Sequence, residues 1–201
     1  MGIIEESVQE LEKVIEGSGC EDGAVVLRRN PGAANCQYER GVCIEALYGG
    51  RSGEFVTSDP VEATTKISFL FSATLANNTA RSAACAVLNV VSAFLCLSRR
   101  VRACPASAHG ACLADLKEYL GRRKVFLIGE CPLLARELGP FMTQDPEDAA
   151  VLIINNEGLL GDRTYEVLAR YTGSREILCI GPSTAGVAGL KRILRFCPYG
   201  T

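Results

Sequence analysis

Three apolar runs in the second half of the chain lack any alternation of polar and apolar positions. Each is rich in Val, Ile and Leu and ends in glycine or polar loop residues. Strands that are apolar on both faces are typical of a parallel sheet covered by helices on both sides. The pattern predicts a β-α-β-α-β unit with a short addition at its end. Its predicted order is strand 124–129, helix 132–138, strand 149–154, helix 161–171, strand 175–180, a short turn or helix at 185–191 and a last strand at 192–197.

The first half of the chain has a different pattern. Residues 3–16 carry an apolar stripe at helical spacing, and glycines follow it. Short β-type runs at 24–29, 42–48 and 53–57 are separated by turn residues, which indicates a small antiparallel meander. Asp59-Pro60-Val61-Glu62 resembles a helix start, so a helix is expected from there to Leu75.

An almost wholly apolar helix is expected from a cap at Asn78 to about Leu97. Residues 98–112 contain Pro105 and Gly110 and read as an irregular connection, followed by a short helix over 113–120. The predicted fold is therefore α/β, with a small α+β domain over 1–100 and a three-layer parallel-sheet domain over 101–201.

Composition narrows the class of protein. The chain has 201 residues, 48% of them hydrophobic, and a net charge of −2. This charge provides no general attraction to nucleic acid or to an anionic membrane, so neither is expected as a partner. The amino-terminal segment is acidic and amphipathic, unlike a signal peptide, and the apolar helix near 83–97 is marginal for a membrane span. We expect a cytoplasmic protein.

Ten cysteines are present, and no CxxC pair occurs among them. Without a secretory signal, we expect reduced thiols that act as small hydrophobic residues. Cys104 and Cys112 flank His109, the single histidine, in the expected loop. Such side chains can hold a transition metal such as zinc, with a fourth ligand from Cys43, Cys85 or Cys96. The alternative is that this segment is an ordinary structural loop.

Polar residues follow each of the three apolar strands, and parallel sheets bind ligands beyond the carboxyl ends of their strands. The loop after the first strand lacks the GxGxxG spacing that favours dinucleotides. Hydroxyls and backbone amides in the last loop can hold an anion or a polar ligand, or can simply cap a strand-to-helix turn. The residues concerned are Gly129, Glu130, Asn155, Asn156, Glu157, Gly181, Pro182, Ser183 and Thr184.

Three carboxylates, Glu130, Glu157 and Asp162, follow two strands that should be neighbours. They can bind a cation or transfer protons, or they can cap helices in contact with water. Asn89 is a polar residue within the apolar helix. It satisfies a buried backbone group or points into the cleft between the domains.

Several stretches resemble the family described as heavy-metal chelation proteins, a family of unknown function. The similarity covers about residues 75–190, and the first 60 residues agree only in architecture. After Gly129 the family tends to have an aromatic-Pro-aromatic segment, where this chain has Cys131-Pro132-Leu133. The stretches that carry the resemblance are AVLNVVSA (86–93), LKEYLGRRKVFLIGECPLLARELG (116–139), AAVLIINNEGLLGDRTYEVLARY (149–171) and ILCIGPSTAG (177–186).

The resemblance implies an amino-terminal domain like that of enolase, a Rossmann-like second domain and a site in the cleft between them. The residues that it places there are Asn89, Gly129, Asn155, Thr164, Gly181, Pro182, Ser183 and Thr184. The leading hypothesis is a protein that binds a small ligand, or a heavy metal or its complex, in this cleft. Two alternatives remain open: an enzyme acting on a nucleotide-like or one-carbon substrate in the same cleft, and a non-catalytic module that works by forming homo-oligomers.

Overall fold

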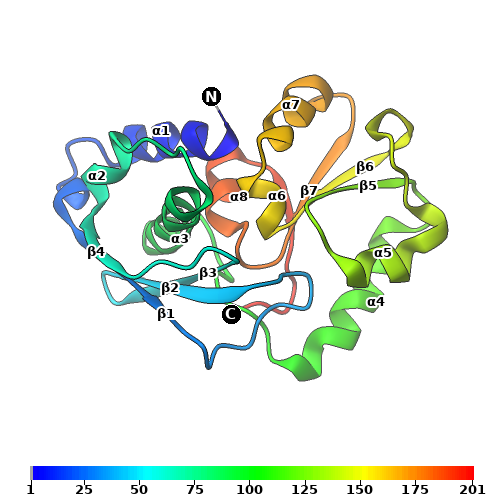
Figure 1. Ribbon diagram of the computed structural model, residues 1–201, viewed down its shortest axis with the longest axis horizontal. Coiled ribbons are helices and arrows are strands. Elements are labelled where there is room, and N and C mark those ends of the chain that lie inside the picture. Colours follow the sequence, from blue (N-terminus) through cyan, green and yellow to red (C-terminus); the bar gives the residue numbers. More distant parts are fainter. Residues whose placement is uncertain (1) are drawn as a thin grey trace.

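The computed structural model describes residues 2–201, which form two four-stranded sheets with helices packed around them (Figure 1). One sheet is wholly parallel with the strand order β5-β6-β7-β8, as the apolar runs predicted. Its strands are β5 (Val125–Ile128), β6 (Val151–Ile154), β7 (Glu176–Ile180) and β8 (Leu194–Phe196).

Helices cover both faces of the parallel sheet. On one face Val151 and Ile153 of β6 pack with α4 and α5, and on the other Leu152 and Ile154 pack with α6, α7 and α8. Every residue of β6 is buried, which is why its sequence does not alternate. The helices are α4 (His109–Leu120), α5 (Pro132–Leu138), α6 (Asn156–Leu160), α7 (Asp162–Tyr171) and α8 (Ala185–Lys191).

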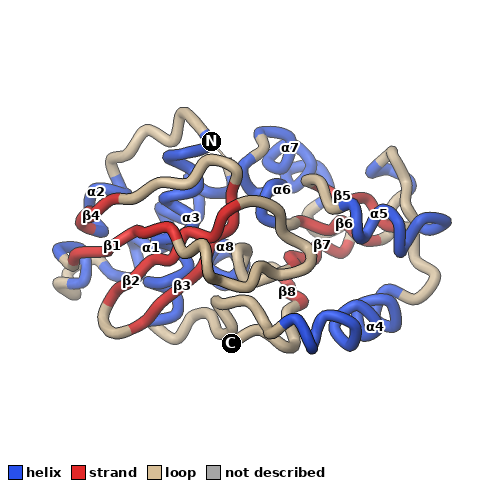
Figure 2. Tube along the Cα trace, turned by 60° about the horizontal axis from the view of Figure 1, so that its bottom comes forward, coloured by secondary structure: helices blue, strands red, loops and turns tan. Residues whose placement is uncertain are grey.

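The second sheet is antiparallel with the order β3-β2-β1-β4. Figure 2 shows its strands as a group separate from the parallel sheet, with loop segments running between the two groups. Helix α3 packs onto one face of this sheet, and α1 packs its apolar stripe against α3 and α8. The strands are β1 (Ala24–Arg29), β2 (Val42–Tyr48), β3 (Arg51–Thr57) and β4 (Ala63–Lys66), and the helices are α1 (Ile3–Ile15), α2 (Ile67–Phe71) and α3 (Asn78–Phe94).

The prediction of a helix from Asp59 to Leu75 is wrong in its first half. Ala63–Lys66 form strand β4, and only the short helix α2 follows. Strand β1 has a free edge that this segment fills, and the branched Thr64 and Thr65 favour a strand. Within residues 2–201, four short 3₁₀ helices complete the fold: Cys20–Asp22, Ala106–Ala108, Gly139–Phe141 and Pro146–Asp148.

Two other boundaries differ by a few residues. Helix α3 is capped by Asn77, whose side chain accepts a hydrogen bond from the Ala80 amide at 2.9 Å, and the helix ends at Phe94. Helix α4 begins at His109, so the histidine lies in the first turn of a helix and not in a loop. No helix within residues 2–201 is both long and apolar enough to cross a membrane.

Helix α3 joins the two halves of the molecule. Its backbone touches Gly53 of β3, where a Cβ atom would lie 2.8 Å from the Val90 nitrogen. It also touches Gly186 of α8, where a Cβ atom would lie 2.5 Å from the Leu88 carbonyl carbon. The main hydrophobic core consequently continues from residues before 100 to residues after 101.

We expect Gly186→Ala to lower the free energy of unfolding by about 1–3 kcal/mol, because the added methyl group meets the backbone of α3. Gly110→Ala is the matched control, since Gly110 also lies in a helix but has nothing within 4 Å of its Cβ position. That control should raise stability by about 0.5–1 kcal/mol. Urea denaturation measures both. Equal effects of the two substitutions would contradict the close packing of α3 on α8.

Candidate functional site

The carboxyl ends of β6 and β7 meet β3, the edge strand of the antiparallel sheet. The Val56 amide donates to Ser183 Oγ at 2.9 Å, and the Val56 carbonyl accepts from Asn156 Nδ2 at 2.8 Å. An edge strand has unpaired backbone groups that must be covered. Here the polar residues after β6 and β7 supply the missing partners, so they join the two sheets.

Asn89 completes this junction from α3. Its Nδ2 donates to the Glu54 carbonyl at 2.7 Å and to the Ser183 carbonyl at 3.0 Å, and its Oδ1 accepts from the Gly186 amide at 2.6 Å. The side chain is fully buried. Its amide therefore satisfies backbone groups of three different segments, which explains a polar residue within an apolar helix.

The loop between β1 and β2 lies over the same strand ends. The Tyr38 and Arg40 carbonyls accept from Asn155 Nδ2 and Asn156 Nδ2 at 3.4 and 3.2 Å. Asn155 Nδ2 also donates to the Glu130 carbonyl at 2.8 Å. Residues 36–41 thus occupy the place where a ligand of a parallel sheet is normally expected.

Glu39 brings a carboxyl group into this junction. Its Oε1 accepts from the Ser183 amide at 2.9 Å, while its buried Oε2 has no partner among the described residues. Burial raises the pKa of Glu39 to about 8, with Glu54 adding to the shift and Ser183 and Arg195 opposing it. Gly181 has φ of +81°, and a Cβ there would lie 2.4 Å from Oε1, so glycine permits this approach.

The remaining residues predicted at the strand ends serve the local backbone. Thr184 Oγ1 donates to the Gly181 and Ile180 carbonyls at 3.1 and 3.2 Å, and the Pro182 carbonyl accepts from the Ala185 amide. Thr164 Oγ1, in the first turn of α7, donates to the Gly158 carbonyl of α6. Thr164, Ser183 and Thr184 are fully buried, and none of them lines a described pocket.

One strand end is open. The loop after β5 borders a pocket of about 310 Å³ between α5, the start of α7 and the segment 142–144. Gly129 and Glu130 both line it, and the Arg163 guanidinium lies 5.0 Å from the centre of the Phe126 ring at its wall. Glu130 is highly accessible, with 83% of its side chain exposed and Arg40 at 3.9 Å.

The three predicted carboxylates do not form one cluster. Glu157 Oε2 accepts from the Glu130 amide at 3.3 Å, so these two lie close together. Asp162 is instead paired with Arg81 at 2.8 Å. The Arg81–Asp162 ion pair connects α3 to the start of α7. Of the three carboxylates, only Glu130 lines the open pocket.

The structure does not support a metal site at Cys104, His109 and Cys112. Across residues 2–201, no three His, Cys, Asp or Glu side chains are grouped so that they can hold a metal ion. The Cys112 sulfur lies 3.4 Å from the Tyr38 hydroxyl, and burial raises the pKa of the Cys104 thiol, which disfavours the thiolate that metals require. His109 begins α4, and its carbonyl accepts from Gln37 at 2.7 Å.

Sequence reasoning did not single out Tyr38 and Glu39. Neither carries a local signal, because each is buried only when the first loop meets the strand ends of the second sheet. Residues 30–41 are too few and too polar to form a hydrophobic pattern that would reveal this contact.

Comparison with known proteins adds evidence on the fold alone. No family model matches the chain, and no curated protein matches it significantly. A solved structure from Pyrococcus horikoshii, described as a protein of unknown function from the DUF364 family, is similar with a TM-score of 0.53 and 14% identity. The similarity covers 90% of this chain and 79% of that one. At this identity the similarity shows the α/β fold alone, and it provides no support for heavy-metal chelation.

Glu39→Gln should make the protein more stable at alkaline pH. Below the ordinary carboxyl pKa of 4.5 both states hold the proton, and Glu39 adds no pH dependence. Between 4.5 and about 8 only the folded state retains it, so the free energy of unfolding falls as pH rises. The variant loses this dependence, and its advantage should grow by on the order of 4 kcal/mol between pH 5 and pH 9.

Urea denaturation across this pH range measures the effect. Glu118→Gln, an exposed glutamate on α4, is the matched control and should differ from the parent by a constant amount. A constant difference for Glu39→Gln as well would show that its carboxyl is ionised in the folded protein at neutral pH.

Proposed function

We propose that this protein binds a small polar organic molecule at the carboxyl end of β5. The observation that carries the proposal is that the loops after β6 and β7 are covered by the chain itself, while the loop after β5 borders a pocket. A volume of about 310 Å³ suits a small metabolite. The proposal keeps the predicted residues Gly129 and Glu130 and moves the site from the interdomain junction to the outer end of the sheet.

The lining of this pocket indicates the class of ligand. It combines one carboxylate, Glu130, and one guanidinium, Arg163, with the polar Thr143 and Gln144. Phe126 and several aliphatic side chains provide apolar contact. A molecule that carries both an ammonium and a carboxylate group, such as a free amino acid, complements these charges.

Two earlier hypotheses are less well supported by this geometry. A heavy metal would need grouped ligands, which residues 2–201 do not provide in this arrangement. An enzyme acting on a nucleotide-like or one-carbon substrate in the interdomain cleft would need an open cleft, but Asn89, Ser183 and Asn156 are buried in hydrogen bonds there. We therefore favour binding over catalysis.

Titration calorimetry with the free amino acids tests the proposal. At least one should bind, and its amine-only and acid-only analogues should bind about tenfold or more weakly, because each loses one charged hydrogen bond. Arg163→Ala and Glu130→Gln should each cause a loss of the same order. Arg122→Ala, an exposed arginine before β5, is the control and should bind like the parent. Unchanged binding in Arg163→Ala and Glu130→Gln would place the ligand elsewhere.

A homo-oligomeric interaction module is the second candidate. The closed junction between the sheets favours it, and β8 leaves one edge of the parallel sheet without a strand partner, with Leu194 exposed to 52%. If two copies pair through this edge, the protein should elute as a dimer in size-exclusion chromatography with light scattering. Leu194→Lys should then yield monomers, because an edge lysine opposes strand pairing. A monomeric parent protein would eliminate this candidate.

A further inference from the structure

A second pocket lies at the opposite end of the parallel sheet from the proposed site. It has a volume of about 430 Å³ and is bordered by the start of β7, the start of β8 and helices α1, α7 and α8. We propose that this pocket binds a small amphipathic carboxylate, with its apolar part inside and its charged group at the mouth. This proposal does not depend on the function suggested above.

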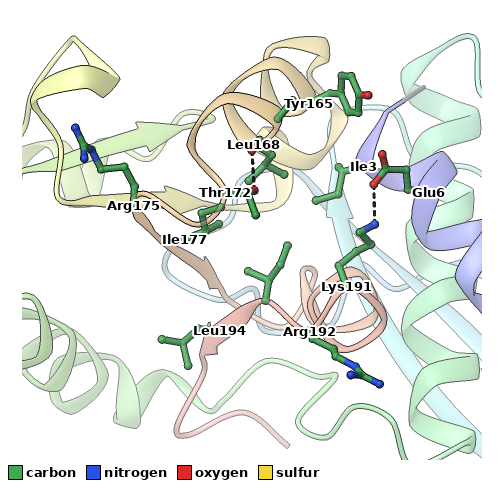
Figure 3. Close-up of a pocket in the computed structure, with 12 residues that line it drawn as sticks. Ile3, Glu6, Tyr165, Leu168, Thr172, Arg175, Ile177, Lys191, Arg192 and Leu194 are labelled. Atoms are coloured by element: carbon green, nitrogen blue, oxygen red, sulfur yellow. Dashed lines mark hydrogen bonds and ion pairs between the residues drawn. The ribbon is translucent and has the colours of Figure 1, made fainter.

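The interior of the pocket is apolar. In Figure 3 Ile3, Leu168 and Ile177 surround the space between the helices and the sheet, and Leu194 lies at its border. Leu194 is 52% exposed and Tyr165 is 38% exposed, so both side chains offer apolar surface beside the pocket. Thr172 directs its hydroxyl to the Leu168 carbonyl at 2.6 Å and so presents little free polarity. An apolar group of a ligand would cover these surfaces.

The charges around the pocket are mostly positive. Arg175, Lys191 and Arg192 line it, with Glu6 as the single carboxylate, in a chain whose net charge is −2. Figure 3 shows the guanidinium groups of Arg175 and Arg192 directed away from the apolar interior. The Arg175 guanidinium donates to the Ser174 and Glu147 carbonyls. Lys191 and Arg192 are therefore the cations that would meet the head group of an anionic amphiphile whose tail is inside.

Lys191 already binds a carboxylate in this position. Its Nζ lies 2.6 Å from Glu6 Oε2, and both side chains are more than two-thirds buried, with 27% and 29% exposed. The pair shows that the mouth accommodates a carboxylate beside Lys191. A ligand carboxylate would share or replace the contact that Glu6 makes.

Arg192 supplies an independent argument. It ends α8 with φ of +55°, in the left-handed conformation that usually contains glycine at this position of a helix. An arginine is strained there, and strained residues often serve a function through their side chains. Glycine would adopt this conformation with less strain, but arginine at this position provides a guanidinium beside the pocket.

Titration calorimetry with decanoate below its micelle concentration tests the proposal. Decanoate should bind at least tenfold more tightly than decanol, and decyltrimethylammonium should not bind measurably, because the mouth carries positive charge. Equal binding of decanoate and decanol would overturn the proposal, as would preferential binding of the cation. Failure of decanoate to bind, whether the protein is a monomer or a dimer that covers the pocket, would also overturn it.

Arg192→Gly separates function from folding. Glycine relieves the strain, so the melting temperature should rise by roughly 2–4 °C, while decanoate should bind about five- to tenfold more weakly. Unchanged affinity in this stable variant would contradict the role of Arg192.

Glu6→Gln should act in the opposite direction. It removes the carboxylate that competes for Lys191, so decanoate should bind several-fold more tightly. Glu12→Gln on the same helix lies outside the pocket and should leave affinity unchanged. Weaker binding in Glu6→Gln would show that Glu6 supports the ligand and would overturn this account of the mouth.

Discussion

The packing of α3 against two glycines is the constraint on which the rest of the structure depends. Gly53 and Gly186 have no side chains, so the backbone of α3 lies directly against a strand on one side and a helix on the other. At such a distance the polar groups of the backbone cannot be reached by water and need partners from the protein. Asn89 supplies them, since it bonds to carbonyls of β3 and of the loop after β7 and to the first turn of α8. One helix therefore carries both the apolar contact and the hydrogen bonds that hold the two sheets together.

This contact determines what can happen at the strand ends of the parallel sheet. Once β3 is held beside β6 and β7, Ser183 and Asn156 bond to the backbone amide and carbonyl of Val56 at the free edge of β3. The loop that contains Tyr38 and Glu39 then covers the remaining groups. A parallel sheet usually leaves this crevice open to a ligand. In this protein the same crevice has become an internal junction. Two pockets beside the parallel sheet lie instead at the outer end of β5 and at the amino ends of β7 and β8.

The ionisation state of acidic groups differs between the sealed junction and the pockets. At the junction Glu39 is buried, its Oε2 has no hydrogen-bond partner among residues 2–201, and its raised pKa keeps it neutral near pH 7. A neutral carboxyl group is compatible with the low polarity of a sealed interface. Charged groups also line the two pockets, with Arg163 and Glu130 at one end of the sheet and Lys191 and Arg192 at the other. These pocket-lining charges, and not the polar groups sealed in the junction, are the ones that a ligand can reach.

The parallel sheet and the antiparallel meander were predictable from local patterns, because a strand buried on both faces must be apolar throughout and turn residues separate short strands. Local patterns failed at Ala63–Lys66, where the open edge of β1 selected a strand over a helix. They also identified Asn89, Asn155 and Ser183 as unusual polar residues without revealing whether these face a ligand or a neighbouring strand. Only the tertiary structure decided this, because the partners of these side chains lie about a hundred residues away along the chain, and hydrogen bonds over such separations leave no periodicity in the sequence.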